Sequence, residues 1–322
     1  MNKVIIQIPC LNEEETLGIT LDALPKSLPG VDVVEYLIVD DGSKDRTVEI
    51  ALEHGVHHVV RHARNSGLAK AFMTGLDACI ERGADIIVNT DADNQYCADD
   101  IEKLVSPLIA GKAEIVIGSR PIADTEHFSF LKKFLQRLGS WVVRLASGTD
   151  IPDAPSGFRA ITRNAAMQLN VFNKYTYTLE TIIQAGQKNI AITSVPIRTN
   201  EDLRPSRLFK SMHAYVTRSM IVICRIFMVY RSFRFFMLLS SIPMLAGITI
   251  GLRFCWYYFY VGDGAGKIQS LILASLLVLL GFLLFTIALL ADLISVNRQL
   301  SEKLDWRIRQ LEVRIKLPDE SE

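Results

Sequence analysis

The sequence has few cysteines and no net charge, and both features narrow what the protein can be. Its five cysteines are an odd number, lie far apart and include no CxxC pair, so neither a disulfide framework nor a zinc site is indicated. Lysine plus arginine and aspartate plus glutamate both total 35, which leaves no overall basic field to hold a nucleic acid. The composition therefore excludes a disulfide-rich secreted scaffold, argues against a nucleic-acid partner, and favours a reducing compartment for the soluble part.

No signal peptide is expected at the N-terminus, and the phosphate-binding loops of common nucleotide folds do not occur in the sequence. The first apolar run covers only residues 4–8 before Pro9, which is too short for a signal peptide and is typical of a β-strand. No GxGxxG or GxxxxGK[ST] motif follows any predicted strand, so neither a dinucleotide-binding fold nor a P-loop is supported. The N-terminal part is therefore predicted to be a cytoplasmic domain of another kind.

Charged residues are nearly absent from one stretch near the C-terminus. Residues 235–252 carry no charge, residues 256–260 are all aromatic, and residues 268–291 form a second uncharged run. With its flanks, each run can cross a bilayer core of roughly 30 Å, which predicts a hairpin of two transmembrane helices, 235–260 and 268–296. Lysine and arginine flank both outer ends, so the positive-inside rule places the N-terminal domain and both termini in the cytoplasm. An integral protein of the cytoplasmic membrane is expected.

Segments of mixed apolar and basic character flank this predicted hairpin. Residues 127–147 and 208–234 each combine apolar side chains with lysines and arginines, which favours helices at a membrane surface. For residues 127–147, packing on the soluble domain is the alternative. The tail, residues 297–322, has leucine and isoleucine at spacings of three and four. It is predicted to be an amphipathic cytosolic helix that either joins subunits in a homo-oligomer or is simply solvated.

Short apolar runs alternate with helical stretches through residues 1–207. The predicted strands are residues 4–8, 36–39, 58–61, 86–89 and 115–117. The predicted helices are residues 12–24, 67–82 and 98–110. A capping box of Asn12 and Glu15 is expected to open the first helix. This alternation predicts an α/β domain with an open, mainly parallel, Rossmann-like sheet, in which ligands bind at the carboxyl ends of the strands.

Asp91 and Asp93 directly follow the fourth predicted strand, and Gln95 comes close behind. Residues two apart on an extended chain project to the same side, so both carboxylates can reach one hard divalent cation. Such a cation, Mg²⁺ or Mn²⁺, commonly shares its oxygen ligands with a substrate diphosphate. The alternative interpretation is that the aspartates merely cap the next helix.

Two further acidic clusters are expected at the same edge of the sheet. PCLNEE follows the first predicted strand and DDGS follows the second. Their carboxylates can accept hydrogen bonds from a nucleoside base and ribose. RNSGLAK, which opens the third helix, adds backbone N–H donors and cations. GSR and DAPSGFR follow the fifth predicted strand, so three acidic clusters and several cations converge on one mouth.

Taken in order, PCLNEEE, IVDDGSKDRT, RNSGLAKA, NTDADNQ, IGSR and DAPSGFRA resemble the family 2 glycosyltransferases of GT-A fold. The likeness covers about residues 3–210. More narrowly, it resembles the dolichyl-phosphate mannose synthases and their bacterial relatives, the bactoprenol glucosyltransferases, which include membrane-anchored members with a two-span hairpin. The QxxRW element of processive polysaccharide synthases does not occur in the sequence, which favours a single transfer over polymerisation.

The resemblance implies a role for each motif. The residues implied to bind the nucleotide sugar are Pro9, Asn12, Glu13, Asp40, Asp41, Lys70 and Asp91. The metal would be held by Asp91, Asp93 and Gln95. The residues that match positions holding the lipid phosphate are Arg120, Arg137 and Ser140. Asp153 is expected either to orient the acceptor or to act as a base, and Asp93 and Arg120 complete the catalytic set.

The predicted reaction is inverting, metal-dependent transfer of one hexose to a polyisoprenyl phosphate, such as undecaprenyl or dolichyl phosphate, at the cytoplasmic membrane face. Glucose from UDP-glucose is the first choice of donor. The acceptor phosphate is largely ionised at neutral pH, so the reaction needs placement of two anions more than a strong base. The alternatives are the same reaction with GDP-mannose or a UDP-amino-arabinose type of donor, and a non-catalytic nucleotide-sugar-binding membrane module.

Overall fold

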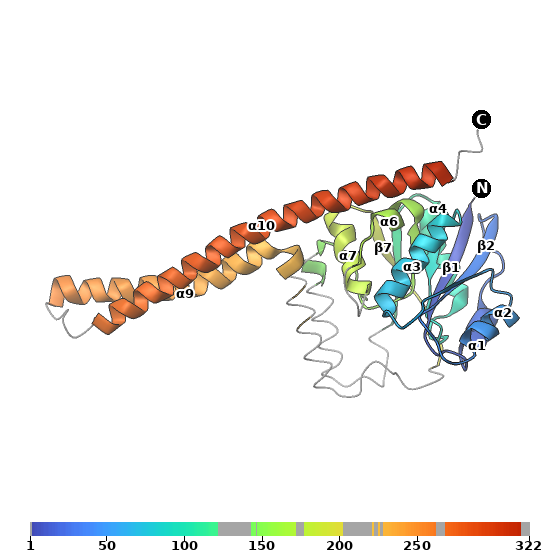
Figure 1. The fold of residues 1–322 in the computed structure, drawn as a ribbon, viewed down its shortest axis with the longest axis horizontal. Coiled ribbons are helices and arrows are strands. Elements are labelled where there is room, and N and C mark those ends of the chain that lie inside the picture. Colours follow the sequence, from blue (N-terminus) through green and yellow to red (C-terminus); the bar gives the residue numbers. More distant parts are fainter. Residues whose placement is uncertain are drawn as a thin grey trace. The chain divides into compact units, whose positions relative to one another are not determined.

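The structure is a computed structural model, shown in Figure 1. It describes residues 2–121, 143–145, 147–171, 177–201, 221, 225, 228–261 and 268–316. The chain divides into two compact units. The first comprises Met1–Ser219 with Glu302–Glu322, and the second is Met220–Ser301.

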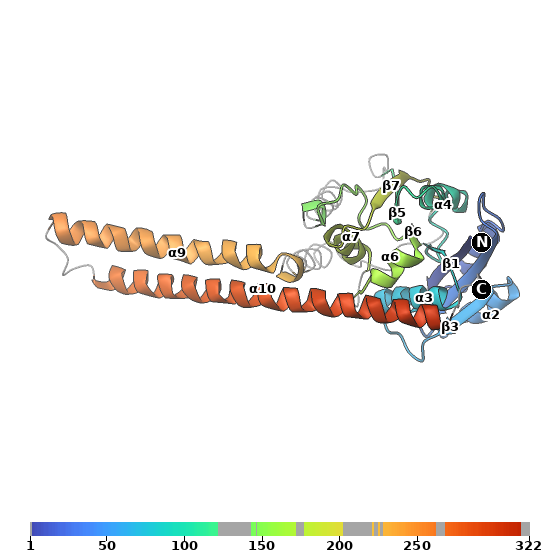
Figure 2. The ribbon, with the colours of Figure 1, turned by 90° about the horizontal axis from the view of Figure 1, so that it is seen from above.

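A seven-stranded sheet forms the centre of the first unit (Figures 1 and 2). Its strands are β1 (Lys3–Cys10), β2 (Val33–Asp40), β3 (His58–Arg61), β4 (Ile86–Asn89), β5 (Ile115–Ser119), β6 (Arg159–Thr162) and β7 (Ile192–Pro196). The strand order is β3-β2-β1-β4-β6-β5-β7, and only β6 runs antiparallel to its neighbours within this sheet. The prediction of an open, mainly parallel α/β sheet is confirmed, and the five predicted strands are β1 to β5.

Helices cover both faces of the sheet. One face carries α1 (Leu17–Ala23), α2 (Thr47–Glu53), a short 3₁₀ turn at Ala98–Asp100 and α4 (Ile101–Ile109). The other carries α3 (Leu68–Glu81), α6 (Arg163–Gln168) and α7 (Thr178–Gln187). Because both faces are covered, the central strands are apolar on both sides, as in β1, which is buried from its second residue onward.

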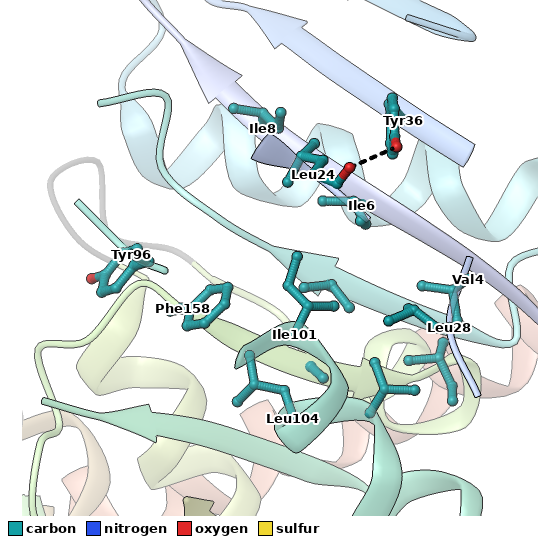
Figure 3. Packing of buried hydrophobic residues seen from close by; sticks show 14 of the residues in the cluster. Val4, Ile6, Ile8, Leu24, Leu28, Tyr36, Tyr96, Ile101, Leu104 and Phe158 are labelled. Carbon is teal, nitrogen blue, oxygen red and sulfur yellow. Dashed lines mark hydrogen bonds between the residues drawn. The ribbon is translucent and has the colours of Figure 1, made fainter. Parts of the chain in front are cut away.

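The main hydrophobic cluster lies between the sheet and the face that carries α4. Val4, Ile6 and Ile8 of β1 point into it, and Ile101 and Leu104 of α4 meet them there (Figure 3). All five side chains are fully buried. At one end of the cluster, nearest the carboxyl ends of the parallel strands, aromatic side chains replace aliphatic ones, and this end leads to the candidate site.

The predicted capping box at the start of the first helix is wrong. Asn12 has a left-handed φ of 55°, and its Oδ1 accepts the backbone N–H of Lys44 at 2.9 Å. The helix α1 begins only at Leu17, after Thr16, whose side chain makes no capping hydrogen bond. Asn12 therefore ties the loop after β1 to the loop after β2, because its amide finds a better-placed partner across the mouth than along its own chain.

The second unit consists of two long apolar helices. They are α9 (Ser232–Trp256), which continues into a π-helical turn at Tyr257–Val261, and α10 (Ile268–Lys316). A Cβ on Gly247 of α9 would lie 2.9 Å from the Ala274 carbonyl oxygen of α10, so the two helices approach closely there. Outward-facing side chains such as Leu238 and Leu283 are exposed. Both helices are long and apolar enough to cross a membrane, which suggests a membrane anchor.

The helix α10 runs without a break through the predicted second span and the predicted tail. Its last part, from Glu302 onward, belongs to the first unit. There Arg309 pairs with Asp77 of α3 at 2.7 Å, and Glu302 pairs with Lys188 at the end of α7 at 3.0 Å. The apolar residues of the tail remain exposed, from 55% at Ile308 to 80% at Ile315. Self-association through this stripe stays a prediction.

Candidate active site

Hydrogen bonds connect the loops that follow β1, β2 and β4. The Asn12 N–H donates to Ser43 Oγ at 2.9 Å, and the Glu13 N–H donates to Thr47 Oγ1 at 2.8 Å. The Thr20 hydroxyl in α1 donates to the Ala92 carbonyl at 3.0 Å, which holds the third loop. The three acidic motifs therefore meet at one edge of the sheet, as the order of strands and motifs predicts.

The two aspartates after β2 are occupied by protein partners. Asp40 is fully buried, and its carboxylate accepts the Ser43 N–H at 2.9 Å and pairs with Arg61 Nε at 2.9 Å. Asp41 pairs with His62 Nδ1 at 2.7 Å and accepts the N–H groups of residues 66 and 67, each at 2.8 Å. Both carboxylates thus fix the two loops between which they lie.

Those two loops enclose a cavity at this edge. Residues 42–44 and 61–65 line it, and its volume is about 790 Å³. Gly42 has a φ of 80°, and a Cβ there would lie 2.9 Å from the Arg64 carbonyl carbon, so only glycine allows the loops to come this close. Contact of Asp40 and Asp41 with a nucleotide stays a prediction.

Asp91 and Asp93 have a different environment. Burial at the mouth, reinforced by the neighbouring Asp93 carboxylate, raises the pKa of Asp91 to about 7, although Arg120 and Arg159 oppose the rise. Within the described part of the chain, no hydrogen-bond donor reaches the Asp91 carboxylate. Asp93 Oδ1 accepts the Gln95 N–H at 3.1 Å across a left-handed turn at Asn94. Among the described residues, this partly buried pair thus accepts a single backbone N–H, at Asp93, and forms no ion pair.

This arrangement fits a divalent cation. Carboxylate and amide oxygens are the ligands that Mg²⁺ and Mn²⁺ prefer, and a cation would offset the charge that raises the pKa of Asp91. Across the described ranges, no three His, Cys, Asp or Glu side chains form a metal-binding group. The cation would therefore depend on two carboxylates together with neutral or substrate oxygens, which is usual where a diphosphate completes the coordination.

Arg120 and Asp153 form a bidentate pair at the same mouth. Arg120 Nε lies 2.8 Å from Asp153 Oδ2, and Nη2 lies 3.0 Å from Oδ1. The backbone N–H of Arg120 also donates to Oδ2 at 3.2 Å. Burial disfavours the guanidinium charge, but these hydrogen bonds outweigh it and raise the pKa of Arg120. The fully buried Asp153 thus directs both of its oxygens to Arg120.

Three other residues that the resemblance assigns to the nucleotide sugar, Pro9, Glu13 and Lys70, lie in different surroundings. Pro9 is buried within β1, and Glu13 Oε2 accepts the Thr16 hydroxyl at 3.1 Å. Lys70 is exposed in the first turn of α3. Arg137 and Ser140 lie outside the described residues, as does most of the predicted helix 127–147.

The sequence analysis missed a buried polar row behind the loop after β4 that holds Asp91 and Asp93, the DxD loop. Gln7, Asn89 and Arg159 occupy matching register positions on β1, β4 and β6, and all three are fully buried. Gln7 Nε2 donates to Asn89 Oδ1 at 2.9 Å. The sequence did contain a signal for this row. The predicted strands 4–8 and 86–89 each hold one polar residue, Gln7 or Asn89, and neither strand alternates polar and apolar residues as a solvent-facing strand does.

Residues 5–169, about half of the chain, match the family model described as Glycosyl transferase family 2. The chain belongs to glycosyl transferase family 2. This assignment confirms the resemblance drawn from the six motifs, and it makes the protein a glycosyltransferase. The matched range contains the loops after β1, β2 and β4 and the pair of Arg120 with Asp153.

Relatives within the family bear names of polyprenyl-phosphate glycosyltransferases. The chain is 32% identical over 218 residues to the UDP-N-acetylglucosamine–dolichyl-phosphate N-acetylglucosaminyltransferase of Methanococcus voltae, covering 61% of this chain and 85% of that protein. It is 26% identical over 210 residues to the polyprenol monophosphomannose synthase of Mycolicibacterium smegmatis, covering 62% and 78%. The expected relationship to this branch of glycosyl transferase family 2 is confirmed.

A solved glycosyltransferase shares the fold of this family 2 chain. Glucosyl-3-phosphoglycerate synthase from Mycobacterium tuberculosis, in complex with Mn²⁺, UDP and glucosyl-3-phosphoglycerate, has a TM-score of 0.54 at 21% identity, covering 70% of this chain and 79% of that one. Another structure of that enzyme contains Mg²⁺ and UDP. The likeness confirms the predicted GT-A fold, and these neighbours bind the cations that the DxD loop here would accommodate.

Proposed function

We propose that this enzyme transfers one hexose, with inversion, from a nucleotide sugar to a polyisoprenyl phosphate at the cytoplasmic face of a membrane. The observation that carries the proposal is that one mouth holds groups suited to two phosphates. Asp91 and Asp93 form a carboxylate pair suited to a divalent cation, and Arg120 lies close enough to oppose the rise in the pKa of Asp91. An enzyme that joins two anionic substrates needs both features side by side.

The donor belongs on the side of the first three loops. Asp91, Asp93 and Gln95 would hold Mg²⁺ or Mn²⁺, which supplies charge neutralisation to the leaving diphosphate. The nucleoside would occupy the cavity between residues 42–44 and 61–65. Pro9, Asn12, Glu13, Asp40 and Asp41 would be its further partners beside the cavity, with Lys70 near its phosphates. The hydrogen bonds between these loops favour a pocket that is already formed before the donor arrives.

The acceptor phosphate belongs beside Arg120, with Arg137 and Ser140 as its further partners. Asp153 serves this side as a positioning residue and not as a base, because both of its oxygens already accept from Arg120. A base is not needed, since the second pKa of a phosphate monoester lies near 6 and the attacking oxygen is largely ionised at neutral pH. Asp153 instead fixes the guanidinium plane that would align the acceptor.

The donor is the least determined part of the proposal. UDP-glucose is the first choice because of the resemblance to bactoprenol glucosyltransferases. The names of the two relatives make GlcNAc and mannose donors the alternatives, together with a UDP-amino-arabinose type of donor. A non-catalytic module that binds nucleotide sugars in the membrane is the alternative from another class.

A panel of donors tests the proposal. Full-length protein reconstituted with undecaprenyl phosphate and Mg²⁺ or Mn²⁺ is expected to form a glycolipid from one of UDP-glucose, UDP-N-acetylglucosamine and GDP-mannose. Chromatography of the extracted lipid identifies the product, and its anomeric configuration by NMR tests inversion. Nucleotide-sugar binding without glycolipid from any donor would support the non-catalytic module instead.

The proposal also fixes the orientation of the helical hairpin, because donors of this kind are cytosolic. A cysteine introduced at Gly264, between α9 and α10, is expected to react with an impermeant thiol reagent added to intact cells. One introduced at Ser321 is expected to react only after lysis. The background variant carries Cys255→Ser, since Cys255 is exposed in α9. The reverse pattern would contradict the cytoplasmic placement of the catalytic domain.

A further inference from the structure

The buried polar row behind the mouth lacks a role in the proposed reaction. Gln7, Asn89 and Arg159 lie side by side on three neighbouring strands, and the next row on the same face is Ile5, Ile87 and Ile161. Burying polar groups costs free energy unless every one is paired, whereas isoleucine would pack this face without that cost. The polar row therefore serves the groups to which it is bonded.

Asn89 of this row, together with Tyr96 and Tyr177, bonds to the backbone of Gly157. Its carbonyl accepts Asn89 Nδ2 at 2.9 Å and the Tyr177 hydroxyl at 3.4 Å, and its N–H donates to Tyr96 Oη at 3.0 Å. Asn89 Nδ2 also donates to Tyr177 Oη at 2.9 Å, which links the two side chains. Tyr96 stacks on Phe158 at the end of the hydrophobic cluster, with its hydroxyl pointing away from that cluster (Figure 3). The carbonyl and the N–H of Gly157 are therefore both bonded to side chains.

Gly157 in turn lies directly against Asp91. A Cβ on Gly157 would lie 3.0 Å from Asp91 Oδ2, 3.1 Å from Oδ1 and 3.0 Å from Tyr177 Oη. Gly157 therefore forms a wall beside both carboxylate oxygens, and a larger residue there would have to push the Asp91 or Tyr177 side chain aside. No donor in the described part of the chain reaches that carboxylate, so the limit that Gly157 can place on its position is steric.

The Tyr177 ring cannot turn away from this position. It stacks on Phe72 of α3 with ring centroids 3.8 Å apart, and the Arg159 guanidinium lies over it at 5.1 Å from the centroid. Arg159 is itself held by the Thr178 carbonyl at 3.4 Å and by Thr181. The hydroxyl that contacts Gly157 therefore has a fixed place.

We propose that Asn89 and Tyr177 are positioning residues, which set the place of the Asp91 carboxylate by holding Gly157 against it. The inference rests on the proposed function, in which Asp91 binds the metal and the donor diphosphate. Groups that orient a metal-binding carboxylate commonly change metal affinity or activity by about 10- to 100-fold when they are removed. Loss of the Asn89 or Tyr177 hydrogen bonds is expected to weaken binding of the metal and the nucleotide and to leave binding of the lipid phosphate unchanged.

The decisive variant is Tyr177→Phe, which removes the hydroxyl and keeps the ring between Phe72 and Arg159. In full-length protein, calorimetric titration of Mn²⁺ in the presence of UDP is expected to show about tenfold weaker binding than wild type. Turnover is expected to fall to a similar degree, with KM for undecaprenyl phosphate unchanged. The matched control is Tyr36→Phe, which removes a hydroxyl that donates to the Pro25 carbonyl at 3.1 Å on the opposite face of the sheet.

A second variant distinguishes the loss of a positioning role from a general folding defect. Gly157→Ala keeps every hydrogen-bonding group but places a methyl group against both Asp91 oxygens, so it is expected to weaken Mn²⁺ binding at least as much as Tyr177→Phe. Normal Mn²⁺ binding by both variants would overturn the inference and leave the proposed function standing. Equal losses in Tyr177→Phe and Tyr36→Phe would also overturn it. If wild-type protein binds Mn²⁺ and UDP but forms no glycolipid from any donor, the proposed function fails while the positioning role is still measured.

Discussion

Two aspartate pairs at the same edge of the sheet have opposite environments. Asp40 and Asp41 follow β2, and their oxygens are bonded to arginine, histidine and backbone N–H groups of the protein. Asp91 and Asp93 follow β4, and burial without a donor raises the pKa of Asp91 to about 7. The first pair holds loops together, whereas the second is left available to a ligand. Residue type and strand end are the same, so the neighbours decide the role.

The largest expected effect comes from neutralising the second pair. Asp91→Asn or Asp93→Asn is expected to lower turnover by at least about 10³-fold, because each removes charge needed at the leaving diphosphate. The melting temperature is expected to stay the same or rise, since the buried charge that lacked a partner is gone. Asp99→Asn is the control, because that side chain is 79% exposed nearby. Full turnover in Asp93→Asn, or in excess EDTA, would contradict the metal assignment.

The next effect concerns the acceptor side. Arg120→Lys keeps the charge but loses the bidentate contact with Asp153, so turnover is expected to fall by about 10²-fold. Nucleotide-sugar binding, measured by calorimetry with metal present, is expected to change little, and Arg137→Ala is expected to behave alike. Arg198→Lys is the control, since the Arg198 guanidinium also contacts an aspartate, Asp100, through Nε at 3.1 Å and Nη2 at 2.9 Å. Donor affinity that falls in step with turnover would assign Arg120 to the donor instead.

A smaller effect is expected from the first aspartate pair, and on stability. Asp41→Asn leaves His62 and two backbone N–H groups with a poorer acceptor, which should lower the free energy of unfolding by about 3 kcal/mol. Urea denaturation measures the loss. Asp22→Asn, at a side chain that is 74% exposed, is expected to change it by less than about 0.5 kcal/mol. If Asp41→Asn leaves the free energy of unfolding unchanged but abolishes nucleotide-sugar binding, the contrast between the two aspartate pairs is wrong.

The smallest effect involves a third aspartate, Asp100, whose charge is fully compensated. Burial would raise its pKa, but hydrogen bonds from Arg198 and Lys103 outweigh burial and lower the pKa to about 2. A lowered pKa in the folded state means stability that is present above pH ~4 and is lost as the pH falls toward 2. Because Arg198 and Lys103 are more than half exposed, the contribution is expected to be only about 1 kcal/mol.

Unfolding measured between pH 5 and pH 2 checks this expectation. Asp100→Asn is expected to be less stable than wild type at pH 5 and nearly equal to it near pH 2. An Asp100→Asn protein whose stability differs from wild type by the same amount at both pH values would contradict the assignment of this pH dependence to Asp100.

Much of the fold follows from local patterns along the chain. The strands β1 to β5 are apolar runs that end in polar turns, and the helix α3 was predicted to within one residue at each end, because burial on a fixed periodicity marks both kinds of element. The last two of the seven strands along the chain, β6 and β7, were not predicted. The strand β6 has only four residues and begins with an arginine, and β7 ends in a proline, so neither has the pattern of a buried strand.

The candidate site divides in the same way. The motifs and their order placed Asp40, Asp41, Asp91 and Asp93 at one edge, since parallel strands end on the same side of a sheet. The sequence assigned Asp91 and Asp93 to a metal and Asp40 and Asp41 to the nucleotide, but it did not show that protein donors surround the second of these pairs. A hydrogen bond to an aspartate comes from whichever donor the folded chain brings near. The partners of Asp41 lie 21 to 26 residues away, and Arg120 and Asp153 are separated by 33.

The sequence by itself determined the enzyme family, the order of the first five strands along the chain, the edge of the sheet that carries the chemistry and the presence of two apolar helices. Periodicity, charge and motif order can be read from the chain before it folds, because they do not depend on tertiary contacts. Only the tertiary structure decided that Asn12 links two loops, that Asp153 belongs to Arg120, and that Gly157 is the wall behind Asp91. These roles depend on distances between residues far apart in the chain, which exist only once the sheet has formed.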